Sequence, residues 1–229
     1  MEQSAVSDAL DGVALESLPV FPLPRVVLFP GASLPLHLFE PRYCAMIEDC
    51  MAKGPRAMAI ALLRPGWQAT YDGRPPIYEI AGAGSILSHE RLADGTHNIV
   101  LRGVARVTLE ELPARGLAYR RAQATVLDDV VPPGGVPDAE VTALFSTAAA
   151  IAAEVRKAYP EFTLGIDAGD APGRIADSVA DRLIADPELR QYILETLDVS
   201  SRVSCVTQAV IELLALIHAQ LQTRGRGAD

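Results

Sequence analysis

Histidine is the residue type in this sequence with the clearest potential to bind a metal ion. The four histidines lie at positions 37, 89, 97 and 218. His89 and His97 flank an Asp-Gly pair at 94–95, which is a strong hairpin signal. A two-residue turn pairs His89 with Val100, and this register puts His89 and His97 on opposite faces of the hairpin. Because position 93 is alanine, His89 does not begin an HExxH motif. We therefore expect no metal site.

The motifs of ATP hydrolysis and of serine proteolysis are also missing. The only lysines are Lys53 and Lys157, and neither follows a glycine or precedes serine or threonine, as a P-loop requires. Both lie on predicted amphipathic helices, which does not favour a Ser-Lys dyad. No GxSxG motif is present. The three cysteines (Cys44, Cys50 and Cys205) form no CxxC pair and are expected to be reduced thiols rather than nucleophiles. We predict no catalytic residue, no cofactor and no enzymatic activity.

Two pairs of charged residues, Glu40 with Arg42 and Arg102 with Arg106, lie near the most distinctive motifs. They could form a polar peptide or ligand site, or an ion-pair network that fixes the junction between strand and helix. The ion-pair network is the simpler interpretation.

The composition argues against several classes of partner. The chain of 229 residues has a net charge of −9 and a pI near 4.9. An acidic protein of this kind is not expected to bind nucleic acid or an anionic membrane. The N-terminus has no basic region followed by an apolar core, and no uninterrupted run of 18 apolar residues occurs. We expect a cytoplasmic protein that spans no membrane.

The segment 18–53 has the most specific pattern. Prolines at 19, 22, 24, 30 and 35 cannot donate ladder hydrogen bonds, so they predict edge strands, strand starts and the corners of a small, bent barrel. Leucines at 34, 36 and 38 alternate as in a half-buried strand. Glu40 and Pro41 then open a helix that continues to Lys53.

The following residues predict more strands. The apolar run 57–63 indicates a strand buried on both faces, and 77–92 indicates a strand bent or bulged at Gly82 and Gly84. Further strands are expected at 96–101, after Gly103, and at 119–127. Together these segments predict a compact, β-barrel-like subdomain with one main helix.

A composition break at 128–138 separates this subdomain from a helical second half. Apolar stripes at helical spacing, the longest at 199–221, predict a C-terminal helical bundle, and Asp186-Pro187 predicts the start of one helix. The expected organisation is α+β, with a tail (1–17), the barrel subdomain (18–128), a linker (129–138), the helical subdomain (139–223) and a second tail (224–229).

The order of these motifs resembles the N-terminal, substrate-binding domain of the ATP-dependent Lon protease. The likeness rests on LPVFPLPRVVLFPGASLPLHLFEPRY, YEIAGAGSI, the Asp-Gly hairpin, RGVARVTL and ILETLDVSSRVSCVTQAV. It is nearest to small bacterial proteins that carry this domain alone. Arg202 matches the arginine of the family's ERL pattern, whereas Ser201 and Val203 depart from it.

This resemblance implies a PUA-like pseudo-barrel that takes part in recognising unfolded or tagged proteins and in oligomer assembly. The ATPase and the Ser-Lys protease lie in later domains of Lon, so proteolysis does not carry over. Metal-binding CxxC pairs of the cereblon-like relatives are absent.

The leading hypothesis is therefore a non-enzymatic module that binds unfolded or apolar protein segments, as an adaptor or regulator in protein quality control with a protease or chaperone. The predicted contact residues are Phe29, Phe39, Tyr43, Met46, Trp67 and Tyr71. Packing of the loop that carries Trp67 and Tyr71 onto the barrel is an equally good account of these two residues. One alternative is an enzyme or small-ligand protein with a pocket between barrel and bundle, lined by His37, Glu40, Arg42 or Arg106. Another is a homo-oligomeric scaffold that self-associates through the 199–221 stripe.

Overall fold

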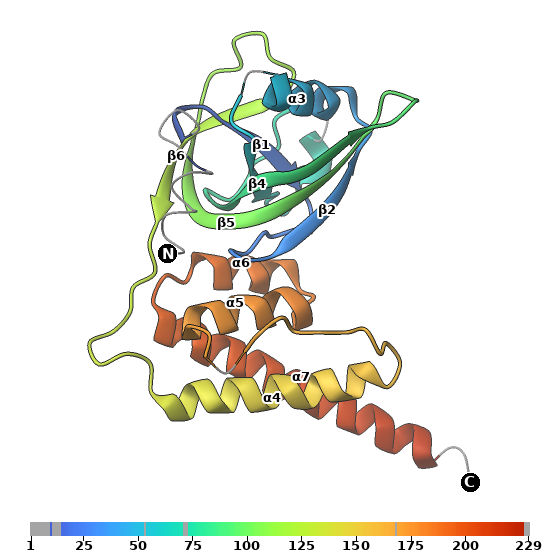
Figure 1. Cartoon of the computed structure of the whole chain (residues 1–229), viewed down its shortest axis with the longest axis vertical. Helices are drawn as coiled ribbons and strands as arrows, with labels where there is room; N and C mark the ends of the chain where they lie inside the picture. The colour runs from blue at the N-terminus through green and yellow to red at the C-terminus, as the bar shows by residue number, and fades with distance from the viewer. Residues whose placement is uncertain (1–9, 11–14, 53, 71–72, 168, 227–229) are drawn as a thin grey trace. The chain divides into compact units, whose positions relative to one another are not determined.

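The computed structural model of the protein describes residues 10, 15–52, 54–70, 73–167 and 169–226. The protein divides into two compact units, residues 1–128 and 129–229, which are described separately (Figure 1). The sequence-based boundary lies at the same residue. A mixed sheet of six strands and five α-helices, counted within the described residues, makes the protein α+β.

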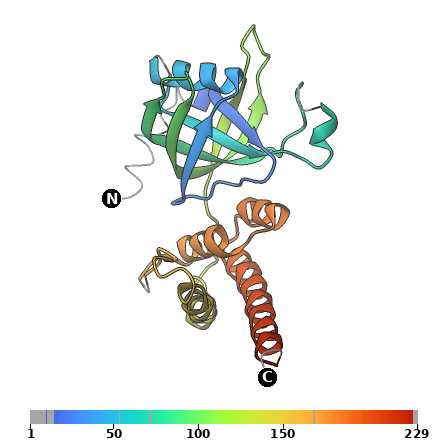
Figure 2. The same ribbon diagram turned by 90° about the vertical axis from the view of Figure 1, so that its right-hand side faces the viewer.

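The N-terminal unit holds all the strands. Its elements are β1 (Leu18–Leu23), β2 (Ser33–Leu38), α3 (Pro41–Ala52), β3 (Ala57–Leu62), the 3₁₀ turn η1 (Trp67–Thr70), β4 (Ile80–Arg91), β5 (His97–Glu111) and β6 (Arg120–Leu127). The strand order is β2-β5-β4-β3-β1-β6, and β5 also pairs with β6. Because the long strand β5 pairs with β2, β4 and β6, the sheet closes on itself. Helix α3 lies across one end of the closed sheet (Figure 1, Figure 2).

Strand β1 corrects the expectation that its prolines exclude an inner position. It lies between β3, to which it is parallel, and β6, to which it is antiparallel. The pairing with β6 covers Leu18 to Val20, and the pairing with β3 covers Val20 to Leu23. Pro19 and Pro22 therefore each have a neighbouring strand on one side only. Only Val20 pairs with both neighbouring strands. Proline is therefore tolerated in this inner strand, because neither proline lies between two strands.

The predicted irregularity in β4 is confirmed. The register between β4 and β5 shifts between Ala83 and Gly84 and again between Ile86 and Ser88. A Cβ atom on Gly82 would lie 1.9 Å from the carbonyl oxygen of Leu28, so the glycine allows the segment after β1 to lie against β4.

Strand β3 is buried on both faces, as its continuous apolar run predicts. Ala57, Ala59 and Ala61 belong to one core cluster, which contains residues of β1, β4, β5 and β6. Met58 and Ile60 belong to a second cluster, which contains the buried face of α3. The two clusters fix the sheet and the helix that crosses its end.

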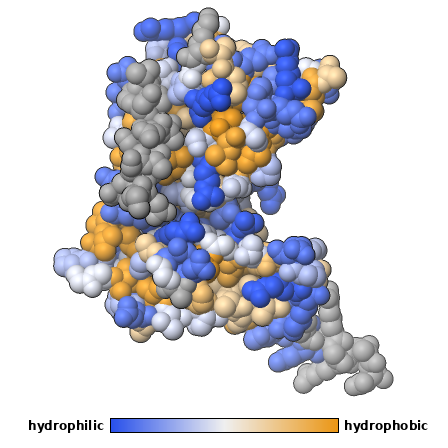
Figure 3. Space-filling view, viewed as in Figure 1, coloured by the Kyte–Doolittle hydropathy of each residue, from blue (hydrophilic) through white to orange (hydrophobic). Residues whose placement is uncertain are grey.

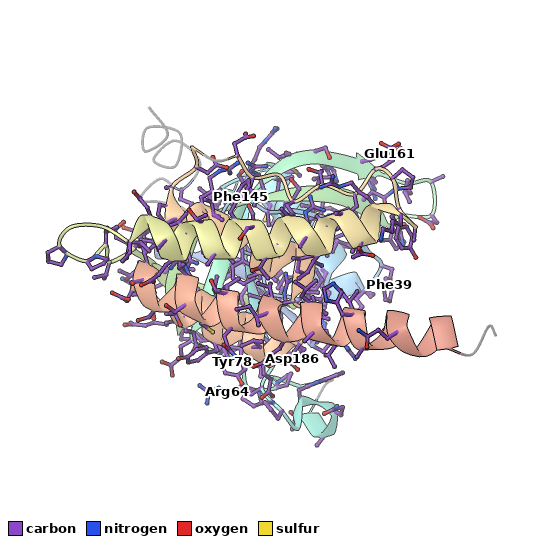
Figure 4. All side chains as sticks on the ribbon, turned by 90° about the horizontal axis from the view of Figure 1, so that it is seen from below. Phe39, Arg64, Tyr78, Phe145, Glu161 and Asp186 are labelled. Atoms are coloured by element: carbon purple, nitrogen blue, oxygen red, sulfur yellow. The ribbon has the colours of Figure 1, made fainter. Side chains whose placement is uncertain are left out.

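The C-terminal unit is helical. Its elements are α4 (Asp138–Arg156), α5 (Pro172–Leu183), α6 (Pro187–Glu195) and α7 (Val199–Arg226). The predicted start of a helix at Asp186-Pro187 is confirmed, since Leu189 N donates to Asp186 Oδ1 at 2.7 Å. Helix α7 contacts α4, α5 and α6. Figure 4 shows α4, which carries the labelled Phe145, lying alongside α7, and α7 continuing beyond the end of α4.

The apolar stripe of α7 is fully buried only in its first half. Val199, Val203, Val206 and Val210 are buried, whereas Leu213 and Ile217 of the same stripe are half-buried, and Ile211 and Leu216, which lie outside the stripe, are exposed. By length and composition alone, the 22 residues Val199–Gln220 are long and apolar enough to cross a membrane, with a mean hydropathy of 1.4. One such helix is weak grounds for a membrane span, and the buried, ion-paired Arg202 in its first turns is unusual for one.

Arg202 connects α7 with two other segments of the C-terminal unit. Its side chain is fully buried, and its guanidinium pairs with Asp129, before α4, and with Asp177 of α5. Val130 N donates to Leu197 O, and Val199 N donates to Val130 O. The first residues of the predicted linker are thus tied to the helices by these contacts.

Candidate functional site

Three of the predicted contact residues belong to the core. Phe29 and Met46 have 0% exposed area and Tyr43 has 5%. Helical spacing turns Tyr43, Met46 and Ile47 of α3 toward the sheet, which explains their burial. The expectation that Phe29, Tyr43 and Met46 form an apolar surface is therefore wrong, because these side chains are covered by their own fold.

Among the predicted contact residues that the structure describes, Phe39 is the most exposed. It lies between the end of β2 and the start of α3, and 66% of it is exposed. Its ring stacks on His37, with the ring centroids 6.1 Å apart. Leu87 of β4 is also exposed (61%).

A shallow groove of ≈ 570 Å³ adjoins these residues. His37, which stacks on Phe39, lines the groove, and so does Ser88, which follows Leu87. His37 Nδ1 and Asn98 Oδ1 are 2.9 Å apart and connect β2 with β5 across it. Figure 3 shows apolar surface over β4 and β5 with polar side chains at its border. We call the groove described above the β2–β5 groove. It is lined by Pro35, Leu36, His37, Ser88, His89, Glu90, Asn98, Ile99 and Val100.

The aromatic residues of the segment between β3 and β4 differ in what the structure describes. This segment projects from the sheet as an arm that carries η1 (Figure 2). Trp67 is partly buried and packs against the core cluster that contains β1 and β3. Tyr71 lies outside the described residues. On the same arm, the Arg64 guanidinium lies 5.1 Å from the centroid of the Tyr78 ring (Figure 4). The packing alternative is therefore supported for Trp67.

The two hairpin histidines correct the predicted register. Arg91 pairs with His97 and His89 with Ile99, so His89 and His97 share one face. His89 Nε2 and His97 Nδ1 are 2.8 Å apart, and the two rings are stacked. No group of three or more histidine, cysteine or acidic residues suited to a metal ion is found among the described residues. The pair is thus a hydrogen-bonded unit within a hairpin.

His97 is the more perturbed member of this pair. Its side chain is fully buried, and its Nε2 lies 3.6 Å from Glu48 Oε1 of α3. Burial lowers the pKa of His97, and nearby His89 and Arg91 lower it further, whereas Glu48 acts in the opposite direction. Arg91 Nη2 also lies 3.4 Å from Glu48 Oε1. The cluster links the β4–β5 hairpin to α3.

The charged pairs predicted near the junction separate into two cases. The Nε and Nη2 atoms of Arg42 lie 3.0 and 2.8 Å from Glu40 Oε2, which confirms the ion-pair interpretation for these residues. Arg102 is exposed whereas Arg106 is buried, so these two residues do not form one surface.

The cysteines are poorly suited to nucleophilic chemistry. Burial, with a smaller contribution from Asp49, raises the pKa of Cys50 to about 12. Burial also raises the pKa values of Cys44 and Cys205. A thiol attacks as its thiolate, so all three are disfavoured as nucleophiles at neutral pH.

Sequence reasoning missed Leu87 and the groove beside it. The available signal was the apolar Ile86-Leu87 pair within a strand, because alternation lets only one of two neighbouring residues point into the core. The groove brings together residues of β2, β4 and β5, and this neighbourhood follows from the strand order, which the sequence alone did not predict.

The closed sheet and the helical unit together have the fold of Lon N-terminal domains. The N-terminal domain of Mycobacterium avium complex Lon protease matches with a TM-score of 0.62 at 19% identity, covering 85% of this chain and 97% of that one. The Lon N-terminal domain protein from Xanthomonas campestris matches with a TM-score of 0.56 at 21% identity, covering 82% of this chain and 95% of that one.

Sequence comparison identifies the family. The sequence model of the ATP-dependent protease La (LON) substrate-binding domain matches residues 17–212, so the chain belongs to this family. Lon protease from Paraburkholderia phytofirmans is 33% identical over 219 residues, and Lon protease from Syntrophus aciditrophicus is 27% identical over 223. These matches cover 92% and 90% of this chain but 26% and 27% of the two relatives. The sequence thus spans about a quarter of the length of these Lon proteases.

Proposed function

We propose that the protein is a substrate-recognition module that binds apolar segments of unfolded proteins. The single observation that carries the proposal is the exposure of Phe39 (66%) beside the β2–β5 groove. Membership in a family described as the Lon substrate-binding domain supports it. An aromatic side chain that is already stacked on an imidazole gives a partner a large apolar contact at low entropic cost.

The groove suits an extended segment better than a small molecule. It is shallow, and its accessible apolar side chains, Pro35 and Val100, lie opposite each other on two paired strands, whereas Ile99 is buried in the core. His37, Asn98 and Glu90 place polar groups around them. An unfolded polypeptide can place alternate side chains on such a surface while its backbone remains hydrated.

Several finer features belong to the same proposal. The closed sheet is assigned as a PUA-like pseudo-barrel and α4 to α7 as a helical bundle. The module is non-enzymatic and cytoplasmic, and it acts as an adaptor or regulator in protein quality control. The raised pKa values of its thiols and a match limited to the Lon substrate-binding domain support the absence of catalysis. The net charge of −9 argues against nucleic acid as a partner.

The test is binding to a permanently unfolded protein, such as reduced and carboxymethylated lactalbumin, measured by biolayer interferometry. The variant Phe39→Ala is expected to weaken binding about tenfold, since removing an interface aromatic commonly costs more than about 1 kcal/mol. Combining it with Leu87→Ser is expected to weaken binding further.

The matched control is Tyr159→Ala, which removes an aromatic side chain of similar exposure (70%) from the C-terminal unit. Equal affinities of the wild type and the Phe39→Ala variant would place the contact elsewhere. No binding of the wild type to the unfolded protein would remove the proposed function. The alternative of a small ligand bound between barrel and bundle stays a prediction.

A further inference from the structure

A second concave site lies in the N-terminal unit and is distinct from the β2–β5 groove. It is a small pocket of ≈ 50 Å³ formed by α3, the arm between β3 and β4, and the start of β6. None of the residues lining it lines the groove. The side chains that matter for its chemistry are Arg42, Arg74, Arg120, Tyr43, Tyr119 and Leu63. Three arginines thus line one small pocket of a protein with a net charge of −9.

Arg120 is the innermost of the three cations. Only 7% of its side chain is exposed. Its Nη2 donates to Pro75 O at 2.7 Å, and its Nη1 donates to Glu111 Oε1 at 3.2 Å. A guanidinium has five N–H donors. Within the described residues, these two bonds hold the group in place and leave donors for another acceptor.

Arg42 and Arg74 continue the positive charge toward solvent. Their side chains are 24% and 43% exposed. Arg74 Nη1 lies 3.9 Å from Glu111 Oε2, so Glu111 is shared with Arg120. Burial lowers the pKa of Arg120, Glu111 opposes this, and the nearby Arg74 and Arg42 lower it further. Each arginine thus lies within the electrostatic field of the others.

The charges and the walls limit the ligand that fits. Three arginines and three acids, Glu40, Glu111 and Asp49, lie in the described surroundings, so the pocket offers guanidinium donors without a surplus of positive charge. A singly charged anion therefore fits better than a phosphate monoester, which carries nearly two negative charges. The Arg42 guanidinium lies 4.7 Å from the Tyr43 ring centroid, and Tyr119 OH donates to Asp49, so both rings serve as apolar walls. Arginine is suited to bidentate carboxylate recognition.

We propose that this pocket binds a carboxylate group of the recognised protein segment. The carboxylate comes from the C-terminus of a polypeptide or from an Asp or Glu side chain with apolar neighbours. Arg120 receives it at the inner end of the pocket, and Arg74 approaches it from the rim. The pocket volume admits one such group and excludes a nucleotide. This inference rests on the proposed function, to which it adds a preference for negatively charged ends or side chains.

The experiment uses three fluorescein-labelled apolar decapeptides and fluorescence anisotropy. The first has a free C-terminal carboxylate, the second a C-terminal amide, and the third an amide with Glu at the penultimate position. If the pocket binds a C-terminal carboxylate, the first peptide binds about tenfold more tightly than the second, as expected for a charge-assisted bidentate hydrogen bond. If the pocket binds a side-chain carboxylate, the third peptide has the highest affinity. Equal binding of all three overturns the inference and leaves the proposed function standing.

The variant Arg74→Gln removes the most exposed arginine of the pocket and is expected to reduce the carboxylate preference to less than about twofold. Its folding is checked by thermal unfolding, and Arg25→Gln, which replaces an exposed arginine outside the pocket, should retain the preference. A preference that persists in Arg74→Gln and in Arg120→Lys overturns the inference.

Two further arms separate the remaining outcomes. If none of the peptides binds, the proposed function fails, and the pocket is judged by NMR titration with N-acetylglycine against its methyl ester. Chemical-shift changes at the pocket caused by the acid and not by the ester support a carboxylate site. If neither compound changes the chemical shifts, the carboxylate site is rejected. Inorganic phosphate that competes better than acetate overturns the choice of carboxylate.

The variant Asp72→Asn removes an acid two residues before Arg74 and should preserve or raise the affinity for the carboxylate peptide. A loss of affinity would contradict an anion site.

Discussion

Gly103 of β5 lies directly against the backbone of Phe29: a Cβ atom added to this glycine would be 2.0 Å from the Phe29 carbonyl oxygen. Gly31 N donates to Gly103 O at 2.9 Å, and Gly103 N donates to Ala32 O at 2.8 Å. The segment between β1 and β2 is thereby fastened to β5. Phe29 belongs to this fastened segment and its side chain is buried, so it cannot contact a partner.

We expect Gly103→Ala to destabilise the N-terminal unit strongly. The atoms that the new methyl group meets are backbone atoms, which cannot move away as a flexible side chain can. Overpacking of this kind costs about 1–3 kcal/mol and occasionally more. The measurement is urea unfolding followed by fluorescence of Trp67, which lies in this unit. Gly169→Ala is the control, since a Cβ there has nothing within 4 Å, and its unfolding midpoint should not change.

Arg202 makes a corresponding prediction for the C-terminal unit. Replacing it with alanine leaves Asp177, which is 3% exposed, without a cation that lies 3.3 Å from its Oδ1. Breaking one side of a buried ion pair costs about 3–5 kcal/mol. We expect Arg202→Ala to lower the urea midpoint of the helical circular dichroism signal, which comes mainly from α4 to α7.

The control for this prediction is Arg182→Ala, because the Arg182 side chain is 49% exposed and its nearest acid is 3.9 Å away. That variant should remain within about 0.5 kcal/mol of the wild type, as is usual for surface positions. If Arg202→Ala unfolds at the same urea concentration as Arg182→Ala, the buried contacts do not stabilise the unit.

The sequence was sufficient to predict the elements and their periodicity, because these follow from local rules. The alternating leucines of β2, the two-faced burial of β3 and the Asp186 cap are all present. The sequence did not predict which residues of the candidate site are buried and which are exposed. Phe29 and Phe39 both lie just outside strands in the segments that adjoin β2, and only long-range packing decides that the first is buried and the second exposed.

The histidine register failed for a related reason. Turn chemistry predicts a two-residue loop at the Asp-Gly pair, but the structure has Leu92 N donating to Thr96 O, so residues 93–95 form the loop and every pair beyond it moves by one position. A three-residue loop that ends in a glycine at positive φ fits the same Asp-Gly signal, so the sequence does not decide between the two loop lengths. The arginine pocket was missed because Arg42, Arg74 and Arg120 are far apart in the sequence and meet only through the closure of the sheet.

Cysteine reactivity offers a direct check of burial on the inner face of α3. Cys50 is 2% exposed and its pKa is raised to about 12, so it should resist alkylation by iodoacetamide in the native protein at pH 8. Cys44 and Cys205 are partly exposed and should react sooner. Peptide mass mapping after timed alkylation measures the order. Modification of Cys50 as fast as Cys205 would mean that the inner face of α3 does not pack against the sheet as described.

The burial of His97 predicts that the stability of the N-terminal unit falls as the pH is lowered from 7.5 to 5.5. The folded state lowers the pKa of His97, chiefly by burial, whereas histidine in the unfolded protein titrates near about 6.5. Below that value the unfolded state therefore binds more protons than the folded state. The free energy of unfolding consequently rises with pH across this range, with a slope that approaches at most about one proton.

Urea midpoints at pH 5.5, 6.5 and 7.5, read from Trp67 fluorescence, measure this slope. The variant His97→Gln should flatten it, because glutamine fills a similar space and does not titrate. His218→Gln, which replaces an exposed histidine on α7, should leave the slope unchanged. A slope in His97→Gln equal to that of the wild type would assign the pH dependence to other groups, and a rise in stability toward pH 5.5 would reverse the sign argued from the burial of His97.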